Sequence, residues 1–204
     1  MRLILVRHGE TDSNKASLAL GREDVELNET GRWQAQRLAE ALESEPIVAV
    51  YSSPLRRTLA TAHAIAERHH LAVELDEGLV EMDIGEMEGL TFQQVRDRYP
   101  QFLQIWLGGR AAYEPMPGGE RLVDVQERAW QALERICAAR PQETVAVVTH
   151  NFVLLTILCR VLGLELADFR RLRHNVAAVS VLQVQDGRMT VLRLNDTCHL
   201  EAAG

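Results

Sequence analysis

Residues 3–11 read LILVRHGET, and this stretch decides the fold expected for the whole chain. Its first four residues are apolar and are typical of a short strand that is buried on both faces, as in parallel sheets covered by helices. Polar residues follow at once, beginning with Arg7 and His8. The stretch therefore predicts a buried parallel strand whose carboxyl end carries a guanidinium and an imidazole.

Strand and helix patterns alternate along the next part of the chain. Asn28 can cap a helix whose apolar positions within residues 35–42 share one face. A strand is expected over residues 47–51, and a helix then begins with Ser53 as N-cap and Pro54 at its first position. This alternation predicts an α/β fold, in which a mostly parallel central sheet carries helices on both faces.

The same alternation continues through the second half. Thr91 and Gln94 form a capping box for a helix that ends near Pro100, and a second short helix is expected through Trp106. The elements expected after these are a helix from residue 122 to 136, a strand over 145–148 and a helix over 152–162 that stops at Gly163.

The C-terminal part of the chain has a different pattern. Two strand-like segments, 177–184 and 189–194, flank Asp186-Gly187, which is a strong signal for a tight hairpin turn. We therefore expect the sheet to end in an antiparallel C-terminal hairpin. No internal repeat or low-complexity tract interrupts the chain, and residues 1–204 are predicted to form a single domain.

Composition limits the possible functions. The formal net charge is -7 and acidic residues are spread along the chain, which predicts no nucleic-acid partner and no membrane partner. The apolar stretch at the start is too short for a signal peptide or a membrane span. The three cysteines lie far apart and indicate neither a disulfide framework nor a thiolate metal site, so a cytoplasmic location is expected.

The residues after the first strand are suited to binding a phosphate group. Arg7 offers a planar fork that matches phosphate oxygens, and the neutral imidazole of His8 can act as a nucleophile. Gly9 allows the backbone to approach a ligand closely, and Thr11 adds a hydroxyl donor. The alternative is a surface Arg-His pair at a strand end, which two residues alone do not exclude.

Two further basic residues follow predicted strands. Arg57 falls in the first turn of a helix, where its charge and the helix dipole both favour an anion. His150 follows the strand over 145–148 and can donate to a phosphoryl oxygen in the transition state. A solvated arginine and a buried structural histidine are the alternatives. Ligands bind beyond the carboxyl ends of parallel strands, which favours a common site for these residues.

A segment with four carboxylates can supply a general acid. A carboxyl group whose pKa is raised by its surroundings can protonate a leaving alcohol. Spacing alone does not select one of the four, and an exposed loop carboxylate is the alternative for each. They are Glu81, Asp83, Glu86 and Glu88.

Together these motifs resemble the histidine phosphatase superfamily, the phosphoglycerate mutase-like proteins, over residues 2–200. RHGET at 7–11 resembles the family signature, with Asn14 at its usual place, and SSPLRRT at 52–58 resembles the segment that carries the second arginine. Glu81 with the glycines and glutamate that follow it matches the acid-bearing segment, and Thr149-His150 matches the second histidine. The chain is also similar in its tail to small bacterial α-ribazole-phosphate and phosphoserine phosphatases.

The resemblance implies a role for each residue. His8 would be the phosphorylated nucleophile, Arg7, Arg57 and His150 would bind the phosphate, and Glu81 would donate a proton to the leaving oxygen. No metal and no cofactor would be needed, because guanidinium and imidazole groups neutralise the charge. The substrate-binding residues it implies are Thr11, Asn14, Gly21, Asn151 and His199. Apart from the resemblance, Arg22, Arg110, Arg121 and His199 are candidates for binding a second anionic group such as a carboxylate, and an ordinary surface residue is the alternative for each.

Departures from the family pattern affect the expected pocket rather than the chemistry. This chain has Ser13 where the family often has Trp, and Asn151 where the family often has Gly. It also has Ile84 and Met87 at two positions that are often aromatic in the family. The phosphoserine type carries a His at the position of Ile84, which weakens that assignment for this chain.

Three functions follow from these observations. The first is a phosphomonoesterase that hydrolyses small phosphorylated metabolites through a phosphohistidine, with α-ribazole 5'-phosphate and phosphoserine among the candidate substrates. The second is a cofactor-dependent phosphoglycerate mutase, although the stretch over 91–118 is modest for the insertions that mutases carry. The third is a non-catalytic phosphate-binding module. A homodimer is a further possibility.

Overall fold

Six strands form one sheet in the computed structural model, which describes residues 1–201. The strand order is β3-β2-β4-β1-β5-β6. β1, β2, β3 and β4 are mutually parallel where they pair, whereas β5 runs antiparallel to β1 and β6 antiparallel to β5. The strands are β1 (Arg2–Arg7), β2 (Ile47–Ser52), β3 (Val73–Leu75), β4 (Thr144–Thr149), β5 (Val179–Gln185) and β6 (Arg188–Asp196).

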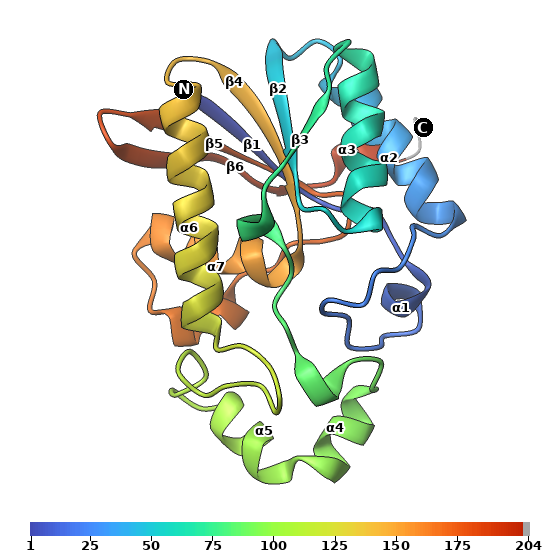
Figure 1. The fold of residues 1–204 in the computed structure, drawn as a ribbon, viewed down its shortest axis with the longest axis vertical. Helices are drawn as coiled ribbons and strands as arrows, with labels where there is room; N and C mark the ends of the chain where they lie inside the picture. The colour runs from blue at the N-terminus through green and yellow to red at the C-terminus, as the bar shows by residue number, and fades with distance from the viewer. Residues whose placement is uncertain (202–204) are drawn as a thin grey trace.

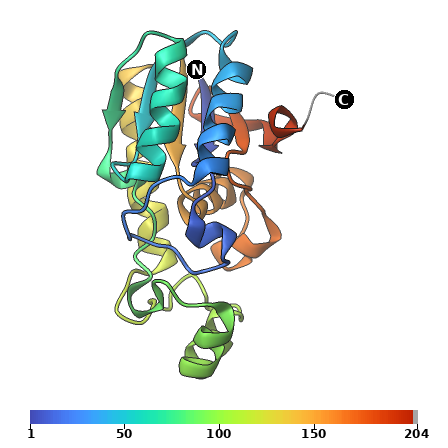
Figure 2. The ribbon, with the colours of Figure 1, turned by 90° about the vertical axis from the view of Figure 1, so that its right-hand side faces the viewer.

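Helices cover both faces of this sheet, as the sequence predicted (Figures 1 and 2). Ile4 and Val6 of β1 pack with α2 and α3 on one face, and Leu3 and Leu5 pack with α6 and α7 on the other. The helices are α1 (Asp12–Lys15), α2 (Glu29–Leu42), α3 (Arg56–Arg68), α4 (Phe92–Arg98), α5 (Pro100–Trp106), α6 (Leu122–Ala139) and α7 (Asn151–Leu162). Four 3-10 turns complete the chain as described: η1 (Glu77–Leu79), η2 (Gly85–Met87), η3 (Leu166–Arg171) and η4 (Cys198–Leu200).

Local sequence signals account for most element ends. The Asn28 side chain accepts from the Gly31 N–H and caps α2, and Thr91 with Gln94 forms the expected capping box of α4. Gly163 ends α7 in the left-handed conformation. The hairpin turn is also confirmed, since Asp186 and Gly187 both have positive φ, as a tight turn between antiparallel strands requires. Within residues 1–201, no helix combines the length and apolar character needed to span a membrane.

The predicted start of α3 is wrong by two residues. α3 begins at Arg56 with Leu55 as N-cap, and Leu55 makes no side-chain cap bond. The Ser53 Oγ lies 2.8 Å from Nε2 of His150 and also accepts a long hydrogen bond, at 3.4 Å, from the Leu55 N–H, so it is shared between a tertiary contact and the chain before the helix. Pro54 therefore precedes the helix.

The parallel strands bring the predicted site together. β1, β2 and β4 end at Arg7, Ser52 and Thr149, and the register places Arg7 beside Thr149 and Ser52 beside Val148. Because β5 is antiparallel to β1, it begins at the same edge. α4 and α5 lie at the end of the molecule away from the N-terminus, beyond this edge (Figure 1).

Two glycines allow the loop after β1 to lie against α2. A Cβ on Gly9 would lie 2.5 Å from the carbonyl oxygen of Gly31, and a Cβ on Gly31 would overlap the backbone of Glu10. The His8 loop and the first turn of α2 thus pack backbone to backbone, which fixes the position of His8.

We predict that Gly31→Ala lowers the free energy of unfolding by about 2–3 kcal/mol, because backbone atoms must move to admit the methyl group. Urea unfolding followed by circular dichroism measures the change. Gly109→Ala is the matched control, since a Cβ there meets no atom within 4 Å. Equal midpoints for the two variants would contradict the close packing of the loop and α2.

Candidate active site

Two histidines meet at the carboxyl edge of the sheet. His8 directly follows β1, and His150 follows β4 and is the N-cap residue of α7. Their ring centroids are 5.2 Å apart, and both side chains are buried. The structure therefore brings together the two imidazoles that the sequence placed after separate strands.

His8 is held as a neutral imidazole with a defined free nitrogen. Nδ1 lies 2.7 Å from the carbonyl oxygen of Gly9, which can only accept, so Nδ1 carries the proton. Burial lowers the pKa of His8 well below its ordinary value, and the charges of Arg57 and Arg7 lower it further. The lone pair therefore lies on Nε2, the atom that a nucleophilic histidine uses.

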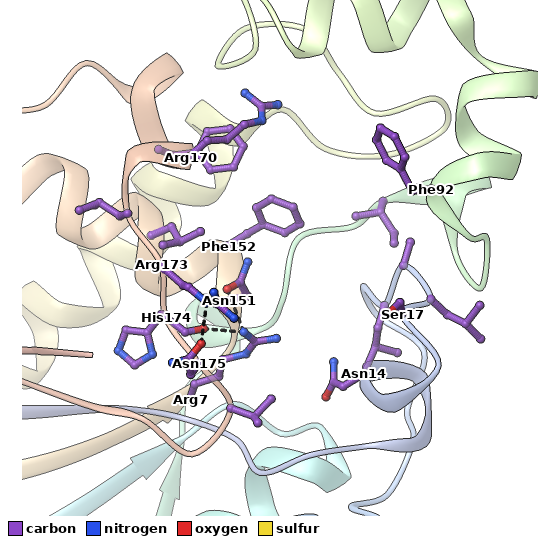
Figure 3. Close-up of a pocket in the computed structure, with 18 of the residues that line it drawn as sticks. Arg7, Asn14, Ser17, Phe92, Asn151, Phe152, Arg170, Arg173, His174 and Asn175 are labelled. Carbon is purple, nitrogen blue, oxygen red and sulfur yellow. Dashed lines mark hydrogen bonds between the residues drawn. The ribbon is translucent and has the colours of Figure 1, made fainter. Parts of the chain in front are cut away.

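Arg7 is fixed by two acceptors at the edge of a cavity. Its Nη1 donates to Oδ1 of Asn151 at 3.1 Å and to the carbonyl oxygen of His174 at 2.6 Å (Figure 3). Burial lowers the pKa of Arg7 to about 10, while the charge of Glu81 acts in the opposite direction. The guanidinium stays charged at neutral pH.

Arg57 approaches the same centre from α3 and is fully buried. Its Nη1 and Nη2 donate to the carbonyl oxygens of Glu23 and Gly21, both at 2.7 Å. Burial lowers the pKa of Arg57, and the charge of Glu81 is the largest effect that raises it. These contacts hold the guanidinium in place.

Three buried nitrogen atoms at this site have no hydrogen-bond partner within residues 1–201. They are Nε of Arg7, Nε of Arg57 and Nδ1 of His150. Buried polar atoms are nearly always paired, so unpaired ones need an explanation. Two of the three atoms belong to arginine cations. An anion such as phosphate could accept hydrogen bonds from these donors.

Glu81 is distinct from the other three carboxylates of its segment. It is only 3% exposed, and its two oxygens accept from the N–H groups of Met82 and Phe152. Burial raises the pKa of Glu81, although these hydrogen bonds and the two arginines lower it. The other three carboxylates have different partners. Asp83 accepts from the Gly85 N–H, and Glu86 accepts from the Tyr99 hydroxyl. Glu88 accepts from the backbone N–H groups of residues 21–23.

The predicted substrate-binding residues have different surroundings. Asn14 and Asn151 line the cavity, whereas the Thr11 hydroxyl is buried in the cap of α1. Gly21 supports Arg57 through its carbonyl and is held by Glu88. His199 does not line the cavity, since its Nε2 lies 3.0 Å from the Ala177 carbonyl oxygen.

The cavity beside Arg7 has a volume of about 1100 Å³. α1 and the loop after it, α4, α5, the start of α7 and residues 169–176 all contribute to its wall. In Figure 3, Arg7 and Asn151 lie together at the level of the His174 carbonyl, with Phe152 beyond them. The buried histidines therefore lie next to a cavity large enough for an organic ligand. Within residues 1–201, no group of three His, Cys, Asp or Glu side chains is arranged to hold a metal ion.

Comparison with known proteins identifies the family. The sequence model of the histidine phosphatase superfamily (branch 1) matches residues 3–197. The chain belongs to the histidine phosphatase superfamily. It is 36% identical to phosphoserine phosphatase 1 of Hydrogenobacter thermophilus over 200 residues, which cover 98% of this chain and 94% of that protein.

Solved histidine phosphatase structures have the same fold. YhfR of Bacillus stearothermophilus superposes with a TM-score of 0.92 at 33% identity, covering 98% of this chain and 99% of the other. A mutant phosphoserine phosphatase of Entamoeba histolytica in complex with phosphoserine has a TM-score of 0.90 at 27% identity, with 98% and 99% covered. The family and these relatives support a phosphomonoesterase of the histidine phosphatase type.

Two cavity residues of this histidine phosphatase were missed in the sequence. Arg170 and Arg173 line the cavity just before β5, and the charge of Arg173 contributes to the lowered pKa of Arg7. The signal was the basic run RRLRH at 170–174 in an acidic chain. By contrast, none of the three arginines proposed for a second anionic group, Arg22, Arg110 and Arg121, lines the cavity, and two of them pair with Glu120 and Asp124.

His174 predicts a pH dependence of stability for this histidine phosphatase. Burial, followed by the charge of Arg7, lowers its pKa to about 4. The unfolded chain binds the proton near pH 6.5, so the stability is complete above that pH and is lost as the pH falls toward 4. Between pH 7 and pH 5, the unfolding free energy of the wild type should fall by about 2 kcal/mol more than that of His174→Gln. Urea titrations at both pH values measure it, and an unchanged loss would contradict the neutral buried imidazole.

Proposed function

We propose that this protein hydrolyses phosphomonoesters of small metabolites through a phosphohistidine at His8, with phosphoserine and α-ribazole 5'-phosphate as candidate substrates. The observation that carries the proposal is the neutral buried imidazole of His8 with a free Nε2, near the charges of Arg57 and Arg7, whose Nε atoms are both unpaired. A neutral nucleophile beside fixed cations suits attack on a dianionic phosphoryl group.

In the first step, Nε2 of His8 attacks phosphorus and the bond from phosphorus to the ester oxygen breaks. Arg7, Arg57 and His150 donate to the other phosphoryl oxygens, which spread the charge of the transition state. Glu81 gives its proton to the departing alkoxide, and the burial that raises its pKa supports the protonated form. The products are phosphohistidine and the free alcohol.

In the second step, water attacks the phosphohistidine. The Glu81 carboxylate accepts a proton from the water, and the phosphorus to nitrogen bond breaks. Inorganic phosphate leaves, and His8 returns to its neutral form. The same donors serve both steps, so the proposal requires no metal and no cofactor.

We predict that wild-type protein releases phosphate from phosphomonoesters in excess EDTA, and that His8→Ala lowers kcat by roughly 10⁴-fold or more because the nucleophile is lost. Phosphate release by a colorimetric assay measures it, with circular dichroism to check folding. His63→Ala, which removes an exposed histidine of α3, is the matched control. An active His8→Ala protein would exclude the phosphohistidine route.

The role of Glu81 predicts a dependence on the leaving group. We expect Glu81→Gln to lower kcat/KM by about 10²-fold or more for an alkyl phosphate, but by less than about tenfold for 4-nitrophenyl phosphate, whose leaving group needs no proton. Steady-state kinetics with both esters measure the difference. Glu86→Gln, which changes a neighbouring carboxylate bound to Tyr99, should affect neither ester. Equal losses for the two esters would assign the proton to another group.

The alternative functions give different results in the same assay. A phosphoglycerate mutase would show little phosphate release but would isomerise 3-phosphoglycerate when 2,3-bisphosphoglycerate is added. A non-catalytic module would bind phosphate esters without turnover by either route. The family match and the named phosphatases among the relatives support hydrolysis.

We also place the protein in the cytoplasm. Cys137, Cys159 and Cys198 are all free thiols, which suits a reducing compartment. The homodimer remains a prediction from the sequence.

A further inference from the structure

The wall of the cavity opposite Arg7 is apolar. Side chains from the loop after α1, from residues 84–90 and from α4 and α5 form it, together with Phe152 and Phe169. The members from the first three regions are Leu18, Ala19, Leu20, Ile84, Met87, Leu90, Phe92, Val95, Phe102, Leu103, Trp106 and Leu107. A polar leaving group such as serine would leave this surface in contact with water.

Two residues of the wall are exposed although they are large and apolar. Phe92 on α4 is 62% exposed and Leu107 after α5 is 57% exposed, and both line the cavity. Figure 3 shows Phe92 on the side of the cavity away from Arg7. Apolar side chains at the rim of a cavity gain free energy when an apolar ligand covers them.

The deeper part of the wall is aromatic. Trp106 lies 5.6–6.3 Å, centroid to centroid, from Phe102, Phe152 and Phe169. Phe152 directly follows Asn151, the residue that binds Arg7. A group that extends from a phosphate at Arg7 therefore meets aromatic rings first.

We propose that the leaving alcohol of the physiological substrate is bulky, apolar and ring-bearing, and that it packs against this wall while its phosphate lies at Arg7. The inference rests on the proposed function and names the substrate class of the same site. The wall is continuous with the phosphate site through residues 151 and 152, so the leaving group is the occupant that the geometry favours.

The size of the cavity agrees with this occupant. Its volume of about 1100 Å³ is just above the range of cavities that hold drug-sized organic molecules, roughly 300–1000 Å³. The three-carbon body of phosphoserine would fill only a small part of it. Ile84 and Met87 add apolar area to this space, and the charged groups of the wall lie on the segment before β5, where the Arg170 guanidinium is 5.2 Å from the centre of the Trp106 ring.

The first experiment compares esters whose alcohols have similar acidity, so that chemical reactivity does not decide the result. We expect kcat/KM for 2-(2-naphthyl)ethyl phosphate to exceed that for ethyl phosphate and for phosphoserine by roughly 100-fold or more. Binding of the matching non-hydrolysable phosphonates to His8→Ala protein, measured by calorimetry, should show a preference for the naphthyl compound in the same direction.

The second experiment tests the wall itself. Phe92→Ser and Leu107→Ser should each lower the ratio of kcat/KM for the naphthylethyl ester to kcat/KM for the ethyl ester by about five- to tenfold. Tyr113→Ser is the matched control, because Tyr113 is 65% exposed and lies in the same region without lining the cavity. The variants change exposed residues outside the catalytic centre and should remain folded.

Each outcome is decisive. Equal kcat/KM values, or a preference for phosphoserine, would overturn the inference while leaving the phosphatase function intact. Hydrolysis of none of the esters would overturn the proposed function, and the phosphonate binding would still test the wall. If Phe92→Ser or Leu107→Ser converts a dimer to a monomer in ultracentrifugation with the substrate ratio unchanged, the wall is an interface between copies and the inference is wrong.

Discussion

The concentration of positive charge at the carboxyl edge of the sheet is the constraint on which the rest of the structure depends. Arg57 is fully buried and Arg7 partly buried close to His8, and burial lowers the pKa of each. Unpaired buried cations are costly, so the fold supplies acceptors for them: the carbonyl oxygens of residues 21, 23 and 174 and Oδ1 of Asn151. The charge of Glu81 stabilises both cations as well. These acceptors come from segments far apart in the sequence.

This arrangement also explains why the surrounding loops are so strongly fixed. Glu88 accepts from the backbone of residues 21–23, whose carbonyl oxygens in turn accept from Arg57. The loop at 21–23 is therefore held between a carboxylate and a guanidinium. Burial lowers the pKa of His8 and of His150, and the charges of Arg57 and Arg7 lower both further, so both imidazoles stay neutral. Stability and reactivity thus depend on the same charges.

Much of the fold followed from local patterns, because buried strands, caps and a tight turn are determined by nearby residues. The sequence predicted β1, the caps at Asn28 and Thr91, and the C-terminal hairpin, all of which are confirmed. It missed β3, since three residues carry no periodic signal. It misplaced the start of α3 by two residues, and no local pattern shows the contact of Ser53 with His150, which lies 97 positions away.

The candidate site was predictable only in part, because it depends on contacts between residues that are far apart in the sequence. Strand ends indicated Arg7, His8 and His150, but the selection of one carboxylate among four depends on burial that the sequence does not show. The position of His199 on the Ala177 carbonyl and the presence of Arg170 and Arg173 in the cavity depend on the path of residues 163–178. Tertiary contacts decide all of these.

The reversed direction of β5 has a consequence for how this protein can evolve. The phosphate-binding residues lie on loops that follow the parallel strands. Arg170 and Arg173 instead lie on the loop that precedes β5, here called the entering loop. The entering loop also supplies the His174 carbonyl oxygen that holds Arg7, so only α4 and α5 (Figure 1) can change in length and composition without disturbing the reaction centre. Selectivity on α4 and α5 is therefore inherited separately from the chemistry, so a lineage can exchange one substrate for another while its reaction centre stays constant.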